Sequence, residues 1–140
     1  MTASPANSQP YPSEREADVV LRDGSTVHVR PVHAEDEPAM RPFLDQISPQ
    51  SIGFRFFGAA DLNWVTARSV DVDYADRFAL VAETGVPRRI LAHAAYVRID
   101  DTRAEVAFLV ADEWQGRGIA TILLAHLAHL ASVAERNCHR

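Results

Sequence analysis

Hydrophobic and polar positions along the chain follow two periods, and the shorter one predicts a sheet. Runs in which β-branched and aromatic residues crowd together or alternate with polar ones are typical of strands. Such runs occur at residues 19–21, 26–30, 77–82, 90–97 and 104–110. The Asp23-Gly24 pair predicts a tight hairpin between the first two runs, and Gly85-Val86-Pro87 predicts an antiparallel pair from the third and fourth.

The longer period, of three to four residues, predicts helices between and after these strands. The first apolar stripe consists of Met40, Phe43, Leu44 and Ile47. This helix is expected to be capped near Asp36, and Pro42 predicts a kink or a late start. Ser48-Pro49 predicts a short second helix towards Phe57, and Asp61 another through residue 68. The mixture of elements predicts an α/β (α+β) fold.

A glycine-bearing turn joins the strand at 104–110 to a last helix. Its sequence is Gln115-Gly116-Arg117-Gly118-Ile119-Ala120, and the apolar face of the helix consists of Ile119, Leu123, Leu127, Leu130 and Ala134. The first N–H groups of a helix have no intrahelical acceptor and lie at the positive end of its dipole, so they attract anions. Gly116 and Gly118 would let a diphosphate approach the main chain, beside the cation of Arg117. Taken alone, two glycines and an arginine before a helix often form only a tight turn.

Two histidines in predicted strands have ordinary structural explanations. Val27 and Val29 alternate with His28, so we expect His28 on the other face and partly exposed. His93 lies in an apolar run, and we expect a hydrogen-bonded core histidine rather than a catalytic base.

The turn and its surroundings resemble the acyl-CoA-binding signature of the GNAT superfamily of N-acetyltransferases, Gln/Arg-x-x-Gly-x-Gly/Ala. Gln115, Gly118 and Ala120 match it, and the preceding strand carries an acidic residue, Glu105, near its start. The run from Leu21 to Pro31 and the segment 55–57 are most similar to the bacterial protein-lysine acetyltransferase branch. The resemblance implies a mixed, mostly antiparallel central sheet flanked by helices. It also implies transfer of an acetyl group from acetyl-CoA to an amine, with a protein lysine as the candidate acceptor.

The same resemblance assigns roles to individual residues. It implies that Glu105 is the general base, acting directly or through water, which suits an acceptor amine that must lose a proton to attack. It implies that main-chain groups around Leu109 and Val110 bind the pantetheine arm. The diphosphate would be held by the turn and helix start, made of Gln115, Gly116, Arg117, Gly118, Ile119, Ala120 and Thr121. A solvent-facing or salt-bridged strand residue remains the alternative for Glu105.

Other interpretations stay open at this point. In the family the first two helices wall the acceptor groove, which would place Arg55 and Phe56 or Phe57 near the substrate. A helix end packed into the core is the favoured reading of that segment. The whole chain could also be a CoA-responsive regulatory module without turnover, or an inactive fragment of a larger acetyltransferase. In a third reading it is a structural α/β fragment whose glycines only turn the chain.

Composition bounds the size and surroundings of the fold. At 140 residues and 47% hydrophobic content, the chain suits one domain, which we place at 18–140 behind a disordered tail at 1–17. The net charge of -5 predicts neither a nucleic-acid partner nor a polybasic membrane anchor. The single cysteine, Cys138, fits a reducing compartment, so we expect a cytoplasmic protein. His126 and His129 lack further ligands nearby in the sequence, and no metal site is predicted.

The family comparison also predicts that the domain is incomplete at its C-terminus. Relatives continue past the last helix with further strands and a helix, and that region carries the tyrosine that protonates the departing thiolate. We therefore expect a fragment, a shortened form, or a chain that borrows the missing part from a partner. A homodimer formed by edge pairing or domain exchange is the corresponding hypothesis.

Overall fold

The centre of the molecule is a five-stranded sheet with the strand order β1-β2-β3-β4-β5. Every strand is antiparallel to its neighbours, which confirms the mostly antiparallel sheet expected from the sequence. The computed structural model describes residues 10–47 and 62–138, with 133–138 as helical backbone only. The strands are β1 (Ala17–Val20), β2 (Thr26–Pro31), β3 (Arg77–Thr84), β4 (Arg89–Arg98) and β5 (Ala104–Val110).

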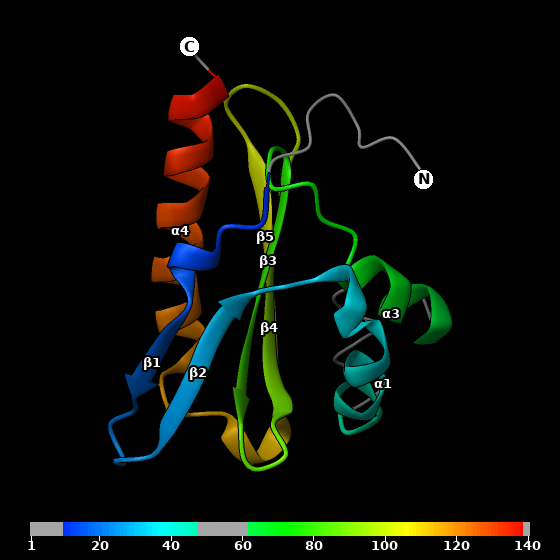
Figure 1. The fold of residues 1–140 in the computed structure, drawn as a ribbon, viewed down its shortest axis with the longest axis vertical. Coiled ribbons are helices and arrows are strands. Elements are labelled where there is room, and N and C mark those ends of the chain that lie inside the picture. The colour runs from blue at the N-terminus through cyan, green and yellow to red at the C-terminus, as the bar shows by residue number, and fades with distance from the viewer. Residues whose placement is uncertain (1–9, 48–61, 139–140) are drawn as a thin grey trace.

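Helices cover both faces of this sheet (Figure 1). α1 (Glu37–Asp45) and α3 (Leu62–Ser69) lie on one face, and α4 (Ile119–Cys138) runs along the other. Short 3-10 turns precede or connect these elements, namely η1 (Ser13–Arg15), η2 (Ala34–Asp36) and η3 (Asp112–Trp114). The helix predicted from Ser48-Pro49 towards Phe57 lies outside the described residues.

The predicted hairpin between β1 and β2 is confirmed. Gly24 has φ +88°, a value that glycine adopts without the strain of a Cβ. The N–H of Leu21 donates to the carbonyl of Ser25 at 2.7 Å and closes the loop. The strand expected at 104–110 is also confirmed, with the same limits.

Proline 42 does not delay the first helix. α1 begins at Glu37, before Pro42, so the expected late start is wrong. Pro42 is the sixth residue of α1, so it removes one intrahelical hydrogen bond, the one that its N–H would have donated to the carbonyl of Pro38, and the helix continues past it to Asp45. Pro42 is exposed, while Met40, Phe43 and Leu44 are buried as the stripe predicts.

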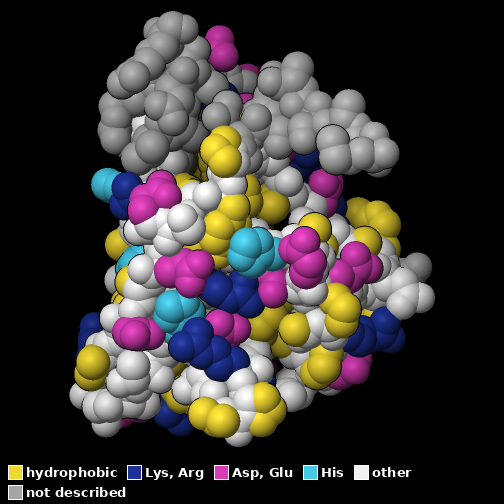
Figure 2. All heavy atoms as spheres, viewed as in Figure 1, with side chains coloured by type: hydrophobic (Ala, Val, Ile, Leu, Met, Phe, Trp, Pro, Cys, Tyr) yellow, Lys and Arg dark blue, Asp and Glu magenta, His cyan; other side chains and the backbone are white. Residues whose placement is uncertain are grey.

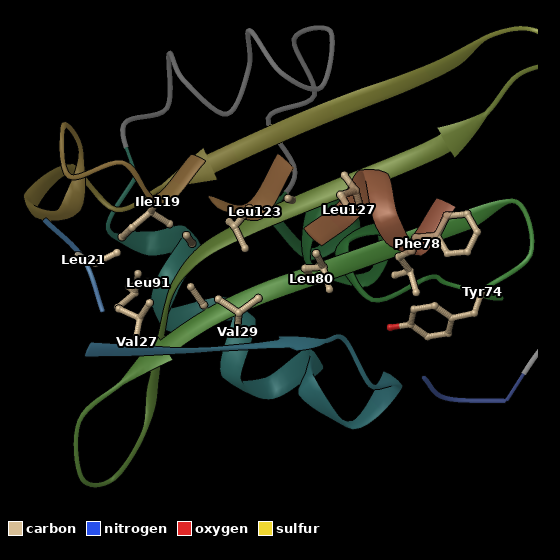
Figure 3. Packing of buried hydrophobic residues seen from close by; sticks show 14 residues of the cluster. Leu21, Val27, Val29, Tyr74, Phe78, Leu80, Leu91, Ile119, Leu123 and Leu127 are labelled. Atoms are coloured by element: carbon tan, nitrogen blue, oxygen red, sulfur yellow. The ribbon is translucent and has the colours of Figure 1, made fainter. Parts of the chain in front are cut away.

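The larger part of the core lies between the sheet and α4 (Figure 3). Four positions of the predicted helix face are buried there, Ile119, Leu123, Leu127 and Leu130. They pack against side chains from the strands and the hairpin loop, including Leu21, Val27, Val29, Leu80 and Leu91. The fifth predicted position, Ala134, has no described side chain. Because this face is continuous from the first residue of α4, the start of the helix is fixed against the sheet.

A second cluster fills the opposite face of the sheet. Met40, Phe43 and Leu44 of α1 and Val65 of α3 meet sheet residues such as Val81 there. His93 is 1% exposed on this face, and its Nε2 lies 2.9 Å from the carbonyl oxygen of Ser69. The prediction of a hydrogen-bonded core histidine is confirmed.

Residues 10–17, which the sequence analysis placed in the tail, contact the sheet. The ring of Tyr11 stacks on His33 with centroids 3.7 Å apart, and its hydroxyl donates to the carbonyl of Pro31 at 2.9 Å. Ala17 begins β1 and is paired with Val29. Composition alone could not indicate the stacking of Tyr11, its hydrogen bond or the start of β1 at Ala17. The domain boundary at residue 18 stays a prediction.

Charged side chains of both signs are interspersed on the face shown in Figure 2. Arg30 of β2 donates to both oxygens of Asp36 at 2.8 Å and to Glu83 of β3 at 3.0 Å. Burial raises the pKa of Asp36, but the hydrogen bonds from Arg30 and from the His33 backbone outweigh it and keep that pKa below its usual value. The network ties η2, and with it the start of α1, to the middle of the sheet.

No helix within the described ranges is both long enough and apolar enough to cross a membrane. Across those same ranges, no group of three or more His, Cys, Asp or Glu side chains is arranged to hold a metal ion.

The burial of α4 makes a prediction about two adjacent leucines. Leu123→Ala should lower the free energy of unfolding by about 2 to 5 kcal/mol, because Leu123 is fully buried and the cavity cannot close completely. Leu124 is 47% exposed, so Leu124→Ala should change it by no more than about 0.5 kcal/mol. Urea denaturation of both variants checks this, and equal losses would contradict the packing of α4.

Candidate functional site

The outer edge of β5 is the first component of the candidate site. The N–H of Ala111 donates to the carbonyl of Leu91 on β4 at 2.8 Å. Alternate residues of an antiparallel strand point their backbone groups to the same side. The N–H and C=O groups of Leu109 therefore point towards β4, while those of Phe108 and Val110 point to the outer edge, where no described strand pairs with them.

This alternation distinguishes Val110 from Leu109, the two residues that the sequence predicts to bind the pantetheine arm. Val110 presents its backbone outward, and its carbonyl accepts a hydrogen bond from Nε2 of Gln115 at 3.2 Å. Leu109 turns its backbone inward, and its side chain is buried on the α1 and α3 face. The geometry favours Val110 over Leu109 for contacts along the edge, and it adds Phe108, which period-2 spacing from Val110 could have indicated.

The turn after β5 is held by its own backbone and by Gln115. The N–H of Trp114 donates to the carbonyl of Ala111 at 2.8 Å, which closes η3. Nε2 of Gln115 reaches both the Val110 carbonyl, at 3.2 Å, and Oδ1 of Asp112, at 3.3 Å. Gln115 therefore fastens the turn to the end of the strand, a role that the motif alone did not indicate.

Gly116 and Gly118 form an open cradle in this turn. Their φ values are +79° and +87°, in the left-handed region that favours glycine. A Cβ built on either residue would have no heavy atom of the described residues within 4 Å, beyond its chain neighbours. The glycines are therefore required by backbone conformation rather than by protein packing, and the space above them is accessible to a ligand.

The start of α4 supplies hydrogen-bond donors beside the cradle. The first intrahelical bond runs from the N–H of Ile122 to the carbonyl of Gly118 at 3.2 Å. The N–H groups of Ile119, Ala120 and Thr121 precede it and have no intrahelical acceptor. The side chain of Ile119 is buried while those of Ala120 and Thr121 are exposed. This combination is typical of an anion site at a helix N-terminus.

Arg117 lies beside these amides with two contacts. Its guanidinium carbon is 4.4 Å from the centroid of the Trp114 ring, a stacking distance. Its Nη1 lies 3.1 Å from Oδ2 of Asp23 in the β1–β2 loop. Neither partner was predicted from the sequence, because no local pattern indicates that Arg117 stacks on Trp114 or that the hairpin loop approaches it.

A pocket of about 300 Å³ lies on the face of the sheet that carries α3. Cross-strand pairs from β4 and β5 form part of its lining, with Glu105 opposite Val97 and Ala107 opposite Ala95. Trp64, on α3, contributes to the wall. Glu105 precedes Val110 by five residues, so it lies roughly 17 Å along the strand from the last residue of β5 at about 3.4 Å per residue.

The two carboxylates that line this pocket, Asp71 and Glu105, differ in their ion pairs. Asp71 pairs with Nη1 of Arg68 at 3.1 Å and with Nη2 of Arg77 at 3.7 Å. Among the described residues that line the pocket, Glu105 is the carboxylate outside those ion pairs. Its side chain is exposed and can exchange a proton with a bound molecule or with water.

Two other titratable side chains, those of Tyr74 and His28, do not contribute to this arrangement. The hydroxyl of Tyr74 donates to the carbonyl of Val32, and burial raises its pKa well above the usual value. His28 is partly exposed as predicted, and its ring nitrogens face Asp18 at 2.8 Å and Glu16 at 3.1 Å. The segment 55–57, for which the sequence favours a helix end packed into the core over a place near the acceptor, lies outside the described residues.

Comparisons with known proteins agree with this geometry. Residues 34–140 match the model of the Acetyltransferase (GNAT) family. The GNAT domain of S. lividans PAT has a TM-score of 0.80 and 39% sequence identity, over 89% of this chain and 76% of that one. The fold expected from the sequence resemblance is confirmed.

Two curated relatives extend the comparison. An acetyltransferase from Pseudomonas aeruginosa is 32% identical over 125 residues, which are 86% of this chain and 66% of that protein. Acetyltransferase Pat from Mycolicibacterium smegmatis is 46% identical over 112 residues, 78% of this chain and 34% of that protein. The chain therefore spans about two thirds of the length of the first relative and about a third of the second.

The open cradle makes a prediction about two glycines of equal backbone strain. Gly118→Ala and Gly24→Ala should each cost about 1 to 2 kcal/mol of unfolding free energy. The φ angle is near +88° at both, and within the described residues a Cβ at either would have no heavy atom within 4 Å beyond its chain neighbours. Chemical denaturation of the two variants measures this directly. A much larger loss at Gly118 than at Gly24 would mean that protein atoms fill the cradle.

Proposed function

Because the chain belongs to the acetyltransferase (GNAT) family, we propose that it binds acetyl-CoA and transfers the acetyl group to an amine. The observation that carries this proposal is the continuity of three features: the outward backbone of Val110, the glycine cradle, and the amides that precede the first intrahelical bond of α4. A long anionic thioester requires such a continuous track, whereas a turn that only reverses the chain does not.

Along this track, acetyl-CoA would make two kinds of contact, one through its diphosphate and one through its pantetheine arm. The N–H groups of Ile119, Ala120 and Thr121 receive the diphosphate, with the cation of Arg117 beside them. The cradle of Gly116 and Gly118 lets the phosphates approach the main chain. The outward backbone of Phe108 offers one N–H and one C=O to the amides of the pantetheine arm. Val110 offers its N–H, since its carbonyl already accepts from Gln115. The donor supplies the activated acyl group as a thioester.

The pocket beside Glu105 is the proposed acceptor site. An amine reaches it from the α3 face, while the donor lies along the edge of the same strand. Glu105 accepts a proton from the ammonium, directly or through water, since only the neutral amine attacks. A bond then forms from the amine nitrogen to the carbonyl carbon, and the carbon–sulfur bond breaks. The nitrogen loses its extra proton and the departing thiolate takes one up from water, which leaves a neutral amide and a free thiol.

A lysine side chain of a protein is the acceptor that we propose. Its aliphatic stem suits the wall formed by Trp64, Ala95 and Ala107, and its ammonium suits the carboxylate of Glu105. Pat of Mycolicibacterium smegmatis, an acetyltransferase, supports the reaction class by its similarity to this chain. A homodimer and a cytoplasmic location stay predictions.

Replacing the proposed base should separate binding from turnover. Glu105→Gln keeps the shape of the side chain and removes the proton acceptor, so turnover at neutral pH should fall by about a hundredfold or more with unchanged acetyl-CoA affinity. Glu35→Gln, at an exposed site in η2, is the matched control. Thiol release with a panel of amines measures turnover, and calorimetry measures affinity. Unchanged turnover in Glu105→Gln would remove this assignment.

Reversing the charge beside the cradle tests the donor site. Arg117→Glu places a negative charge where an anion is proposed to bind, so acetyl-CoA affinity should fall by about tenfold or more. Arg103→Glu makes the same change in the β4–β5 turn, where Arg103 is 69% exposed and pairs with Asp100. Calorimetric titration that gives equal affinities for Arg117→Glu and Arg103→Glu would contradict the placement of the diphosphate.

A further inference from the structure

The guanidinium that the proposed function assigns to phosphate already has an anionic ligand from the chain. Nη1 of Arg117 lies 3.1 Å from Oδ2 of Asp23, and 94 residues separate the two in sequence. The other carboxylate oxygen of Asp23 accepts from the N–H of Ser25 at 3.0 Å and from its hydroxyl at 2.5 Å. The hairpin loop thus fixes one oxygen and leaves the other directed at Arg117.

This carboxylate is charged and within reach of a ligand. Hydrogen bonds from the Ser25 hydroxyl and backbone, with a smaller effect of Arg117, hold the pKa of Asp23 below its usual value. The side chains of Arg117 and Asp23 are 37% and 44% exposed. Exposed ion pairs of this kind are weak, so a polyanion can replace the carboxylate at little cost.

We propose that Asp23 competes with the phosphates of the donor for Arg117, so that the β1–β2 loop sets the affinity and the release of the donor. The inference rests on the proposed function, and it adds a residue from the opposite end of the chain to the site. A carboxylate and a phosphate bind the same guanidinium donors. Asp23 also repels an incoming polyanion through space. Both effects oppose binding.

The stacking of Arg117 on Trp114 decides the direction of the net effect. If the contact with Asp23 were what orients Arg117, removing it would leave the side chain mobile, and the side chain would then lose conformational entropy on binding a phosphate. Here the guanidinium carbon also lies 4.4 Å from the Trp114 ring centroid, and that contact does not involve Asp23. When the charge of Asp23 is removed, the guanidinium of Arg117 is therefore available to a phosphate and is still oriented by Trp114.

Calorimetric titration of Asp23→Asn and of the unchanged chain with CoA, at low and at high ionic strength, tests this proposal. Asparagine keeps the side-chain oxygen that accepts from Ser25, so the loop retains its turn. Asp23→Asn should bind CoA about three- to fivefold more tightly than the unchanged chain at low salt, and the difference should shrink at high salt.

The chain contains a closely matched control. Oδ1 of Asp100 accepts from the N–H of Thr102 at 2.9 Å and from its hydroxyl at 3.1 Å, and Oδ2 pairs with Arg103 at 2.8 Å. This is the same arrangement at the far end of β5 from the cradle. Asp100→Asn removes an equal charge, and we expect no change in CoA affinity.

A double substitution tests whether Asp23 acts through Arg117. In an Arg117→Gln background, Asp23→Asn should lose most of its effect on affinity. Weaker or equal binding by Asp23→Asn, or an equal gain in Asp100→Asn, would overturn the inference while leaving the proposed function intact. If the unchanged chain and every variant fail to bind CoA, the proposed function fails, and this inference fails with it.

Discussion

The packing of α4 against the sheet is the constraint on which the rest of the structure depends. Ile119 is buried at the first position of the helix, and Leu123 and Leu127 continue the same face into the core. Since the side chain of Ile119 is held inside, the helix start cannot rotate or slide relative to β5. The exposed amides at that start are therefore held in a fixed relation to the outward backbone of Val110. The proposed donor track is a consequence of core packing.

The backbone of the candidate site is held rigidly, whereas one of its side chains, Arg117, is held by an ion pair that can be exchanged. The cradle depends on two glycines with positive φ, and Gln115 fastens it to the strand end. Glu105 lies at the other end of β5, where the pocket on the α3 face begins. Arg117 has a partner from a distant loop, Asp23, and this partner is one that an anion can replace. A rigid backbone site with one exchangeable ion pair suits a reaction in which a polyanionic product must leave.

The sequence predicted what depends on periodicity and local chemistry. The strand at 104–110, the hairpin at Asp23-Gly24 and the apolar face of α4 follow from patterns within single elements, and they agree with the structure. Selecting Val110 over Leu109 requires knowing which neighbour β5 pairs with. Finding Asp23 beside Arg117 requires the order of the strands. The contacts of Tyr11 with His33 and Pro31 depend on tertiary packing in the same way. Local patterns therefore indicated the turn, and the sheet topology completed the site.

Hydrogen exchange of backbone amides, recorded residue by residue with and without CoA, tests the central claim most directly. The account predicts that the amides of Ile119, Ala120, Thr121 and Val110 gain protection together. Amides at the opposite edge, in β1, should exchange as before. Protection elsewhere, with unchanged exchange at the start of α4, would contradict the claim that this helix start and the edge of β5 form one binding track.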